Sequence, residues 1–249
     1  MHDQLKKKFS QNFLIDKNIL YKISNLIKQS NLEILEIGPG NGALTEYILK
    51  SNPKNLTIIE IDKDLVDILN EKFIQFKNIT IINDDFLKNE NVLTKKFDLV
   101  VSNLPYNISS QILIKLAINK FRPKKMILMF QKEFGDRLLD KKLNSLNSII
   151  NCFYSVTRTF DISKNSFFPT PKIKSTIIEF NLLRNSLLME PDIASYINFK
   201  RQIFNKKRKM LGSILKKNTR YKISPDILKK RAESLCLQSF IELFYKTSV

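Results

Sequence analysis

The chain has 249 residues, of which 43% are hydrophobic, and its 42 Lys and Arg residues outnumber its 24 Asp and Glu residues. This length suits one large domain, or an ordinary domain with a small appendage, and the apolar content excludes a disordered chain. No apolar run approaches the ~18 residues of a membrane span, and the N-terminal sequence lacks the apolar core of a secretion signal. The formal net charge of +18 predicts a polyanionic partner, nucleic acid before an anionic membrane surface.

Short apolar runs alternate with segments of helical period over most of the chain. Five runs rich in Ile and Val predict buried parallel strands, at 32–38, 56–62, 79–84, 97–103 and 125–131. Four segments of helical period predict helices, at 43–50, 63–73, 109–118 and 136–143. This order predicts an α/β fold, with a mainly parallel sheet covered by helices on both faces. Two later stretches, 154–162 and 174–183, have no convincing helix between them and are expected to pair antiparallel at the edge of the sheet.

The composition changes near residue 185. Residues 182–249 hold 15 basic and 5 acidic residues in a helical pattern, and Ser224-Pro225 marks one helix start. We therefore expect two domains. The first covers 1–184 and includes a basic N-terminal arm, and the second is a small, basic, all-helical domain over 185–249.

Three glycines, Gly38, Gly40 and Gly42, lie where the first strand passes into the first helix. Backbone at glycine can approach a ligand closely, although an ordinary strand-to-helix turn would use the same letters. Glu60 ends the second strand and Asp85 follows the third, so both carboxylates lie at the edge where open α/β sheets bind ligands. In this order the residues predict a binding site for adenosine. Glu60 would accept hydrogen bonds from the ribose hydroxyls, and Asp85 would accept one from the adenine amino group.

Glu36 lies inside the first strand, directly before the glycines. A buried carboxylate needs partners, and we expect backbone amides of the loop or a ligand group to supply them. Phosphates match a site with so many carboxylates poorly. S-adenosylmethionine carries no phosphate and has a positive sulfonium, so it suits the site better than NAD.

Other kinds of chemistry find little support in the sequence. The only histidine is His2, beside a terminus, so a histidine base would have nothing to fix its position. The two cysteines, Cys152 and Cys236, lie far apart and belong to no Cys/His cluster. We therefore expect no metal site.

The fourth strand ends in Asn103-Leu104-Pro105-Tyr106, at the same edge as the carboxylates. Taken alone, this four-residue sequence is as typical of a turn as of a binding site. The exocyclic amine of adenine is a poor nucleophile because its lone pair is delocalised, and two acceptors held beside it would favour the tetrahedral geometry of attack. The Asn103 amide oxygen and the Leu104 carbonyl are candidates, with Leu104 restricted by Pro105. Tyr106 can stack on an extruded base.

These motifs resemble the KsgA-type (RsmA) small-subunit rRNA adenine dimethyltransferases. The resemblance covers nearly the whole chain, through KKKFSQNFL (6–14), LEIGPGNGALTE (35–46), IEID (59–62), NDDF (83–86), NLPYNISS (103–110), FQKEFGDRL (130–138), SFFPTPKIKS (166–175) and IFNKKRKML (203–211). It implies a Rossmann-like S-adenosylmethionine-dependent methyltransferase domain followed by a small helical domain. It also implies that two adjacent adenosines near the 3′ end of small-subunit (16S) rRNA are dimethylated at N6, within an immature 30S particle during small-subunit assembly.

The resemblance also assigns site residues. The positions that match the family's donor-binding residues are Asn12, Leu14, Gly38, Glu60, Asp85 and Asn103. Residues 103–106 would also face the target adenine, with Phe167 on its other side, although a Phe of this kind is as often a core residue. The chain departs from the family pattern at four positions: Ser10, Thr170, Lys174 and Gly212. Of these, Lys174 bears on RNA contact rather than on the chemistry.

Basic residues at the two ends of the chain are expected to grip the RNA backbone: Lys6, Lys7, Lys8, Arg201, Lys206, Lys207, Arg208 and Lys209. Between Lys200 and Lys217 there are eight basic residues and no acid. A solvated helix face would explain them, but repulsion among like charges favours a phosphate partner.

We expect a cytoplasmic enzyme without a membrane partner, and nothing in the sequence indicates a dimer. Two alternatives remain open at this point. One is an Erm-like methyltransferase acting on 23S rRNA, and the other is an RNA-binding ribosome-assembly factor that has kept the fold without the chemistry.

Overall fold

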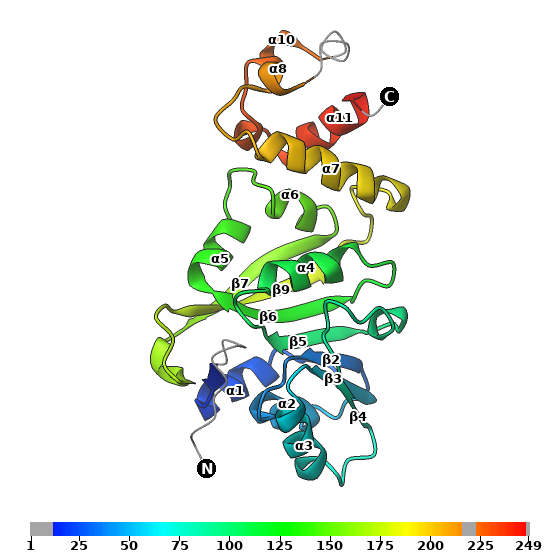
Figure 1. Ribbon diagram of the computed structural model, residues 1–249, viewed down its shortest axis with the longest axis vertical. Coiled ribbons are helices and arrows are strands. Elements are labelled where there is room, and N and C mark those ends of the chain that lie inside the picture. The colour runs from blue at the N-terminus through cyan, green and yellow to red at the C-terminus, as the bar shows by residue number, and fades with distance from the viewer. Residues whose placement is uncertain (1–11, 216–222, 248–249) are drawn as a thin grey trace. The chain divides into compact units, whose positions relative to one another are not determined.

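The computed structural model describes residues 12–215 and 223–247, which divide into two compact units (Figure 1). Within the described part, residues up to 135 together with 156–182 form the first unit, and the others form the second. The first unit ends close to the division expected near residue 185. Residues 136–155, expected in the first domain, instead group with the second unit.

A seven-stranded sheet with the order β4-β3-β2-β5-β6-β9-β7 forms the centre of the first unit (Figure 1). Its strands are β2 (Glu33–Ile37), β3 (Asn55–Glu60), β4 (Ile79–Asn83), β5 (Leu99–Asn103), β6 (Lys125–Gln131), β7 (Tyr154–Ile162) and β9 (Ser175–Leu182). The first five pair in parallel, as predicted, and β9 pairs antiparallel with β6. The two last strands are neighbours at the edge, with the later one, β9, inserted between β6 and β7.

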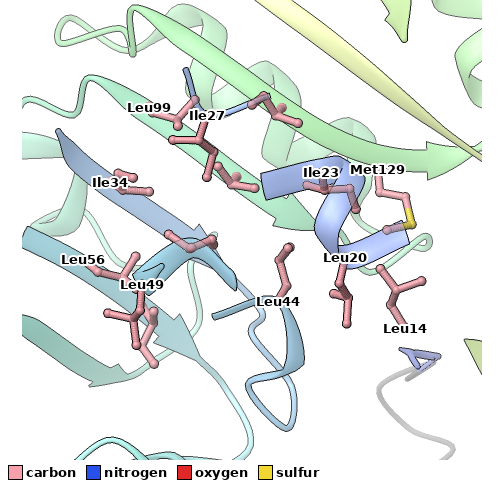
Figure 2. Close-up of a cluster of buried hydrophobic side chains, with 14 of the residues drawn as sticks. Leu14, Leu20, Ile23, Ile27, Ile34, Leu44, Leu49, Leu56, Leu99 and Met129 are labelled. Atoms are coloured by element: carbon pink, nitrogen blue, oxygen red, sulfur yellow. The ribbon is translucent and has the colours of Figure 1, made fainter. Parts of the chain in front are cut away.

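One face of the sheet packs against the N-terminal helices of this unit. These are α1 (Lys17–Ser24), α2 (Ala43–Leu49) and α3 (Lys63–Lys72). Figure 2 shows the core between them and the sheet, where Ile23 of α1 and Leu44 of α2 lie in one cluster with Ile34 of β2. Apolar side chains three or four positions apart on each helix meet alternate residues of the strands, as an amphipathic helix on a pleated sheet requires.

Helix α4 (Ser109–Ile118) agrees with its prediction, but the helix predicted at 136–143 is wrong. Helix α5 instead covers Lys132–Leu138 and begins directly after β6. The ring of Phe134 stacks on Phe130 of β6 with centroids 4.7 Å apart, so an aromatic contact sets this start. A Cβ on Gly135 would lie 2.5 Å from the Thr176 side chain, so this glycine allows the helix to approach β9 rather than breaking it.

A two-stranded ladder joins the start of the described chain to a distant segment. Strand β1 (Phe13–Leu14) pairs antiparallel with β8 (Phe167–Phe168), with Leu14 opposite Phe167. Both of these residues are buried in the cluster drawn in Figure 2, where Leu14 is labelled. The ladder therefore fixes where the chain arrives at the sheet, and with it the position of Asn12.

The second unit is helical. Its helices are α6 (Asn147–Ile150), α7 (Ile193–Phe204), α8 (Leu211–Ile214), α10 (Pro225–Leu228) and α11 (Leu237–Thr247), and α10 starts where Ser224-Pro225 predicted. Short 3-10 turns cover Val92–Thr94 and Lys164–Ser166 in the first unit, and Glu190–Asp192 and Ala232–Ser234 in the second. The core of the unit is aromatic, and the Tyr196 ring meets the rings of Phe240 and Phe244 edge-on.

The basic stretch after Lys200 does not form one helix in the described residues. Helix α7 ends at Phe204, and residues 205–208 form a turn before α8. A run of like charges one turn apart disfavours a continued helix, which accounts for the break. Lys200 itself is buried, and its Nζ donates to the backbone oxygen of Ser145 at 2.8 Å. This lysine therefore joins two segments of the second unit and is not part of an exposed basic face.

Among the described residues, none of the helices combines the length and the apolar character that crossing a membrane requires.

Replacing Gly42 by alanine is expected to lower the free energy of unfolding by roughly 2–4 kcal/mol. Gly42 caps α2 with φ +78°, and an added Cβ would lie 2.7 Å from the Phe73 ring and 2.9 Å from Leu69. Urea denaturation followed by circular dichroism measures the change.

The matched control is Asn31→Gly, at an exposed position with φ 61° that any glycine adopts freely. This change is expected to alter the free energy of unfolding by less than about 1 kcal/mol. Equal effects of the two substitutions would contradict the role given to the Gly42 contacts.

Candidate active site

A cavity of about 270 Å³ lies where β2, β3 and β5 end in parallel. Its lining includes all the residues expected to bind the methyl donor: Asn12, Leu14, Gly38, Gly40, Glu60, Asp85 and Asn103. Leu104, Pro105 and Tyr106 line the same cavity. The parallel register of the sheet therefore brings together residues from Gly38 to Tyr106, and the β1–β8 ladder adds Asn12 and Leu14.

The glycine loop, residues 38–42, is held by side chains from neighbouring elements. The Gly40 N–H donates to Glu60 Oε2 at 3.2 Å. A Cβ on Gly40, whose φ is +60°, would lie 2.7 Å from the Phe13 ring. Lys72 at the end of α3 donates to the backbone oxygen of Asn41 at 2.9 Å. The loop is therefore fixed on three sides before any ligand enters.

Glu60 is buried at the end of β3, and both of its carboxylate oxygens are engaged. Oε1 accepts from the backbone N–H groups of Ile61 at 2.8 Å and Asp62 at 3.0 Å, while Oε2 accepts from Gly40. Burial raises the pKa of Glu60, and these three backbone hydrogen bonds oppose the rise. Besides lining the cavity, Glu60 thus joins the loop after β2 to the loop after β3, a role that the sequence did not suggest.

Asp85 belongs to the acidic loop, which we define as residues 84–90 after β4. Its Oδ1 accepts from the Leu87 N–H at 2.9 Å, and its Oδ2 lies 3.9 Å from the Nζ of Lys88. The adjacent Asp84 also lines the cavity. Hydrogen bonds from the Asn89 side chain and the Asp85 N–H lower the pKa of Asp84. The acidic loop therefore brings two carboxylates to the cavity, of which the sequence analysis singled out only Asp85.

Glu36 lines the cavity from inside β2, with 1% of its surface exposed. Its Oε2 accepts from Thr45 Oγ1 of α2 at 2.7 Å. The expected partners were loop amides or a ligand group, and the protein partner of this carboxyl is a helix hydroxyl rather than a loop amide. Burial raises the pKa of Glu36 to about 8; the Thr45 hydrogen bond opposes this rise and the nearby Glu60 adds to it. The carboxyl is therefore protonated near neutral pH, and a cation entering the cavity would favour its ionised form.

Asn103 ends β5, and its Nδ2 donates to the backbone oxygen of Asn12 at 3.2 Å. Because the nitrogen is engaged, the amide oxygen is the end of the side chain left to accept from a ligand. Leu104 lines the cavity and is 1% exposed. Pro105 packs beside Gly38, where an added Cβ would lie 3.7 Å from its ring. The motif is therefore packed against the glycine loop.

The hydroxyl of Tyr106 shares a hydrogen bond of 2.7 Å with Ser175 Oγ, at the start of β9. Burial raises the pKa of Tyr106, so the phenol stays neutral and does not serve as a base. The bond to Ser175 sets the orientation of the ring, and Ser109 Oγ donates to the Tyr106 carbonyl at 3.1 Å. Neither serine was singled out from the sequence, because one lies 69 residues away and the other looks like an ordinary helix start.

The structure does not place Phe167 beside Tyr106 on the cavity. The Phe167 side chain is 1% exposed, belongs to the core cluster and is absent from the cavity lining. Its ladder partner Leu14 and the apolar surroundings explain the burial. The exposed aromatic of this strand is Phe168, with 50% of its surface accessible. Alternation of side chains along a strand allows only one of two adjacent rings to enter the core.

The expected RNA-binding residues fall into two groups. Lys6, Lys7 and Lys8 lie outside the described residues, as does Ser10. Arg201 and the exposed turn Lys206–Lys209 belong to the second unit.

The electrostatic character of the cavity limits what it can bind. Within the described part of the chain, four carboxyl groups line it, from Glu36, Glu60, Asp84 and Asp85, and no Lys or Arg does. A phosphate would therefore meet carboxylates and no basic side chain among these residues, whereas a positively charged ligand would be attracted. Mixed apolar and polar walls, with backbone amides at the glycine loop, suit a nucleoside that carries a cationic group.

The substitution Glu36→Gln is expected to make stability less dependent on pH. The folded protein holds the Glu36 proton up to about pH 8, whereas the unfolded chain loses it near the ordinary value of 4.5. Rising pH between these values therefore destabilises the native protein, by at most about 1.4 kcal/mol per pH unit, and Gln removes this slope. Urea denaturation at several pH values measures it. The exposed Glu71→Gln serves as the control, and an unchanged slope in the Glu36 variant would contradict the raised pKa.

Known proteins resemble this chain over nearly its whole length. Residues 2–234 match the family model for ribosomal RNA adenine dimethylase. The Pelagibacter ubique (strain HTCC1062) protein named ribosomal RNA small subunit methyltransferase A is 41% identical over 219 residues, which are 85% of this chain and 82% of that protein. The Mycoplasma mobile protein of the same name is 34% identical over 257 residues, covering 99% of each chain.

Two solved structures have a similar fold. A dimethyladenosine transferase from Plasmodium falciparum superposes with a TM-score of 0.81 at 28% identity, covering 95% of this chain and 98% of that one. The 23S rRNA methyltransferase ErmE superposes with a TM-score of 0.72 at 21% identity, covering 96% and 100%, and shows likeness of fold alone. Both agree with a Rossmann-like methyltransferase domain. By the match of its sequence to the family model and to these relatives, the chain belongs to the ribosomal RNA adenine dimethylase family.

Proposed function

We propose that this protein transfers methyl groups from S-adenosylmethionine to N6 of two adjacent adenosines near the 3′ end of small-subunit (16S) rRNA, dimethylating each. The observation that carries the proposal is the position of residues 103–106 on the same cavity as the glycine loop and the carboxylates. Membership of the adenine dimethylase family and the names of the relatives support the reaction and the small-subunit target.

The residues of the cavity fit the proposed donor. S-adenosylmethionine would supply a methyl group activated by a sulfonium, and its adenosine part carries no phosphate. Glu60 would accept hydrogen bonds from the ribose hydroxyls, and Asp85 Oδ2 from the adenine amino group. Asn12 and Leu14 would close the site beside Asn103, whose amide already bonds the Asn12 backbone. The acidic lining favours a cationic donor over a dinucleotide.

The chain's own groups account for the acceptor chemistry. The Asn103 amide oxygen and the Leu104 carbonyl would accept from the two hydrogens of the target amine, holding its nitrogen in line with the methyl group. Tyr106, oriented through Ser175, would stack on the extruded adenine. The amine releases its proton only after it has gained positive charge, so no strong base is needed. This agrees with a phenol at Tyr106 that stays neutral.

RNA binding is proposed to come from the basic residues outside the cavity. Lys6, Lys7 and Lys8 of the N-terminal arm, Arg201 and the exposed turn Lys206–Lys209 would contact phosphates. The second unit would thereby act as the RNA-binding domain and the first as the methyltransferase domain. An immature 30S particle is the proposed substrate, and coupling to small-subunit assembly is part of the same hypothesis.

The reaction is tested by incubating the protein and labelled S-adenosylmethionine with immature small subunits that lack the modification. Mass spectrometry of the RNA is expected to identify N6,N6-dimethyladenosine at two adjacent positions. Absence of label on adenine would contradict the reaction. Label confined to large-subunit RNA in a parallel incubation would favour the Erm-like alternative, and RNA binding without label would favour a non-catalytic assembly factor.

The substitution Asn103→Ala is expected to lower the rate of methyl transfer by at least about 100-fold, because it removes one acceptor that holds the target amine. RNA affinity should change by less than about threefold, since base stacking and phosphate contacts remain. Single-turnover transfer and a filter-binding assay measure the two effects. The control is Asn107→Ala, an exposed residue on the rim of the same cavity. A tenfold loss of RNA affinity in Asn103→Ala would contradict the role given to this residue.

Neutralising the turn Lys206–Lys209 with glutamine is expected to flatten the salt dependence of RNA affinity. Each lost phosphate contact should reduce the slope of log affinity against log salt by about 0.7–0.9. Equilibrium binding at several salt concentrations measures the slope. A variant that loses the same charge at the exposed residues Lys63, Lys77, Lys88 and Lys95 should keep a steeper slope. Equal slopes for the two variants would mean that the turn does not contact phosphate.

A further inference from the structure

The ammonium group of Lys115, on helix α4, donates hydrogen bonds to three backbone carbonyl oxygens of the acidic loop. Its Nζ donates to the backbone oxygens of Phe86, Leu87 and Asn89, each at 2.8 Å. An ammonium group has three N–H donors, and all three are used here. A lysine with a complete set of backbone acceptors differs from one that extends into solvent, because its head group has one defined position.

Charge and burial strengthen this contact. Lys115 is partly buried, and burial lowers its pKa, while the nearby carboxylates of Glu90, Asp85 and Asp84 oppose the fall. Hydrogen bonds from an ammonium to carbonyls are stronger than those between neutral groups, and more so where water is partly excluded. The Nζ also lies 5.3 Å from the centre of the Phe86 ring. The acidic loop is thus held by the buried side chain of Phe86 and, through its backbone, by Lys115.

Helix α4 is fixed at its other end to the acceptor motif. It begins at Ser109, whose Oγ donates to the Tyr106 carbonyl at 3.1 Å. Ile112, Leu113 and Leu116 of the helix are buried, so it cannot shift independently of the sheet. One rigid helix therefore connects residues 103–106 with the loop that carries Asp85.

We infer that Lys115 is a positioning residue that holds the acidic loop in place, so that Asp85 recognises the amino group of the donor's adenine. The inference rests on the proposed function, because it takes S-adenosylmethionine as the ligand of the cavity. Lys115 is not among the described residues that line the cavity. It acts through the backbone of residues 86–89, which places the carboxylate of Asp85 relative to Asn103.

The test is Lys115→Met, which keeps a long apolar side chain and removes the three donors. Calorimetry compares S-adenosylhomocysteine with an analogue in which hydrogen replaces the 6-amino group of the adenine. The wild-type protein is expected to prefer the amino compound by about tenfold, since Asp85 would lose its donor in the analogue. In Lys115→Met the amino compound should bind about tenfold more weakly and the analogue almost unchanged, so the preference disappears.

The matched control is Lys88→Met, which removes the same charge beside the same carboxylates. Lys88 Nζ lies 3.9 Å from Asp85 Oδ2 and its side chain is 85% exposed, so it does not fix the loop. This variant should keep the preference for the amino compound. A preference lost equally in both variants would mean that electric charge, and not the position of the loop, is responsible, and would overturn the inference.

Failure of the inference and failure of the proposed function give different results. If the wild-type protein does not bind S-adenosylhomocysteine, the donor assignment falls and the role of Lys115 falls with it. Suppose that the wild-type protein binds S-adenosylhomocysteine. If Lys115→Met then keeps the preference for the amino compound, or lowers the affinity for both compounds equally, only the positioning role of Lys115 is overturned. Should the Met variant not fold, Lys115→Gln replaces it, because glutamine is uncharged, shorter and has only two N–H donors. Its ratio of affinities for the two compounds is measured in the same way. The preference for the amino compound should fall, and an unchanged preference would overturn the inference.

Discussion

The site depends on the parallel pairing of β2 with β3 on one side and with β5 on the other. In this register Glu36 lies opposite Ile58 of β3 and Val101 of β5, so the loops after all three strands emerge at one edge. An antiparallel neighbour would deliver the start of its strand instead of its end. Strand β9 does so, and it brings its first residue, Ser175, to the Tyr106 hydroxyl. The same edge of the sheet therefore carries the residues proposed to bind the methyl donor and those proposed to bind the target adenine.

Burial at this edge disfavours the ionised form of a carboxyl group, and the surroundings of Glu60 and Glu36 differ in how far they oppose this effect. Glu60 keeps its oxygens bonded to three backbone N–H groups, which favour the ionised form. Glu36 has one hydroxyl partner, and burial raises its pKa to about 8. The two acids therefore differ in their bonding: Glu60 is held to the glycine loop and to the loop after β3 by three backbone N–H groups, whereas burial favours the protonated form of Glu36.

The basic residues of the chain divide in a similar way. Lys72 and Lys115 donate to backbone carbonyls of the glycine loop and the acidic loop, and Lys200 donates to Ser145 within the second unit. These side chains hold loops and segments together. The side chains of Lys206–Lys209 are exposed, and they are the part of the second unit proposed to contact RNA. The excess of positive charge is thus in part structural and in part available to a polyanion.

The sequence by itself determined the parallel strands, the glycine loop, the two strand-end carboxylates and residues 103–106, because short-range periodicity and motif order record these features. The tertiary structure alone decided the burial of Phe167, which depends on a ladder between residues about 150 positions apart. The start of α5 and the break after Phe204 depend on local effects that the apolar period does not record, namely the stacking of Phe134 on Phe130 and the repulsion among like charges after Lys200. The partners Thr45, Ser175 and Lys115 are also tertiary. A hydroxyl or an amine in the sequence does not reveal which distant acceptor will meet it, because that depends on how the helices pack against the sheet.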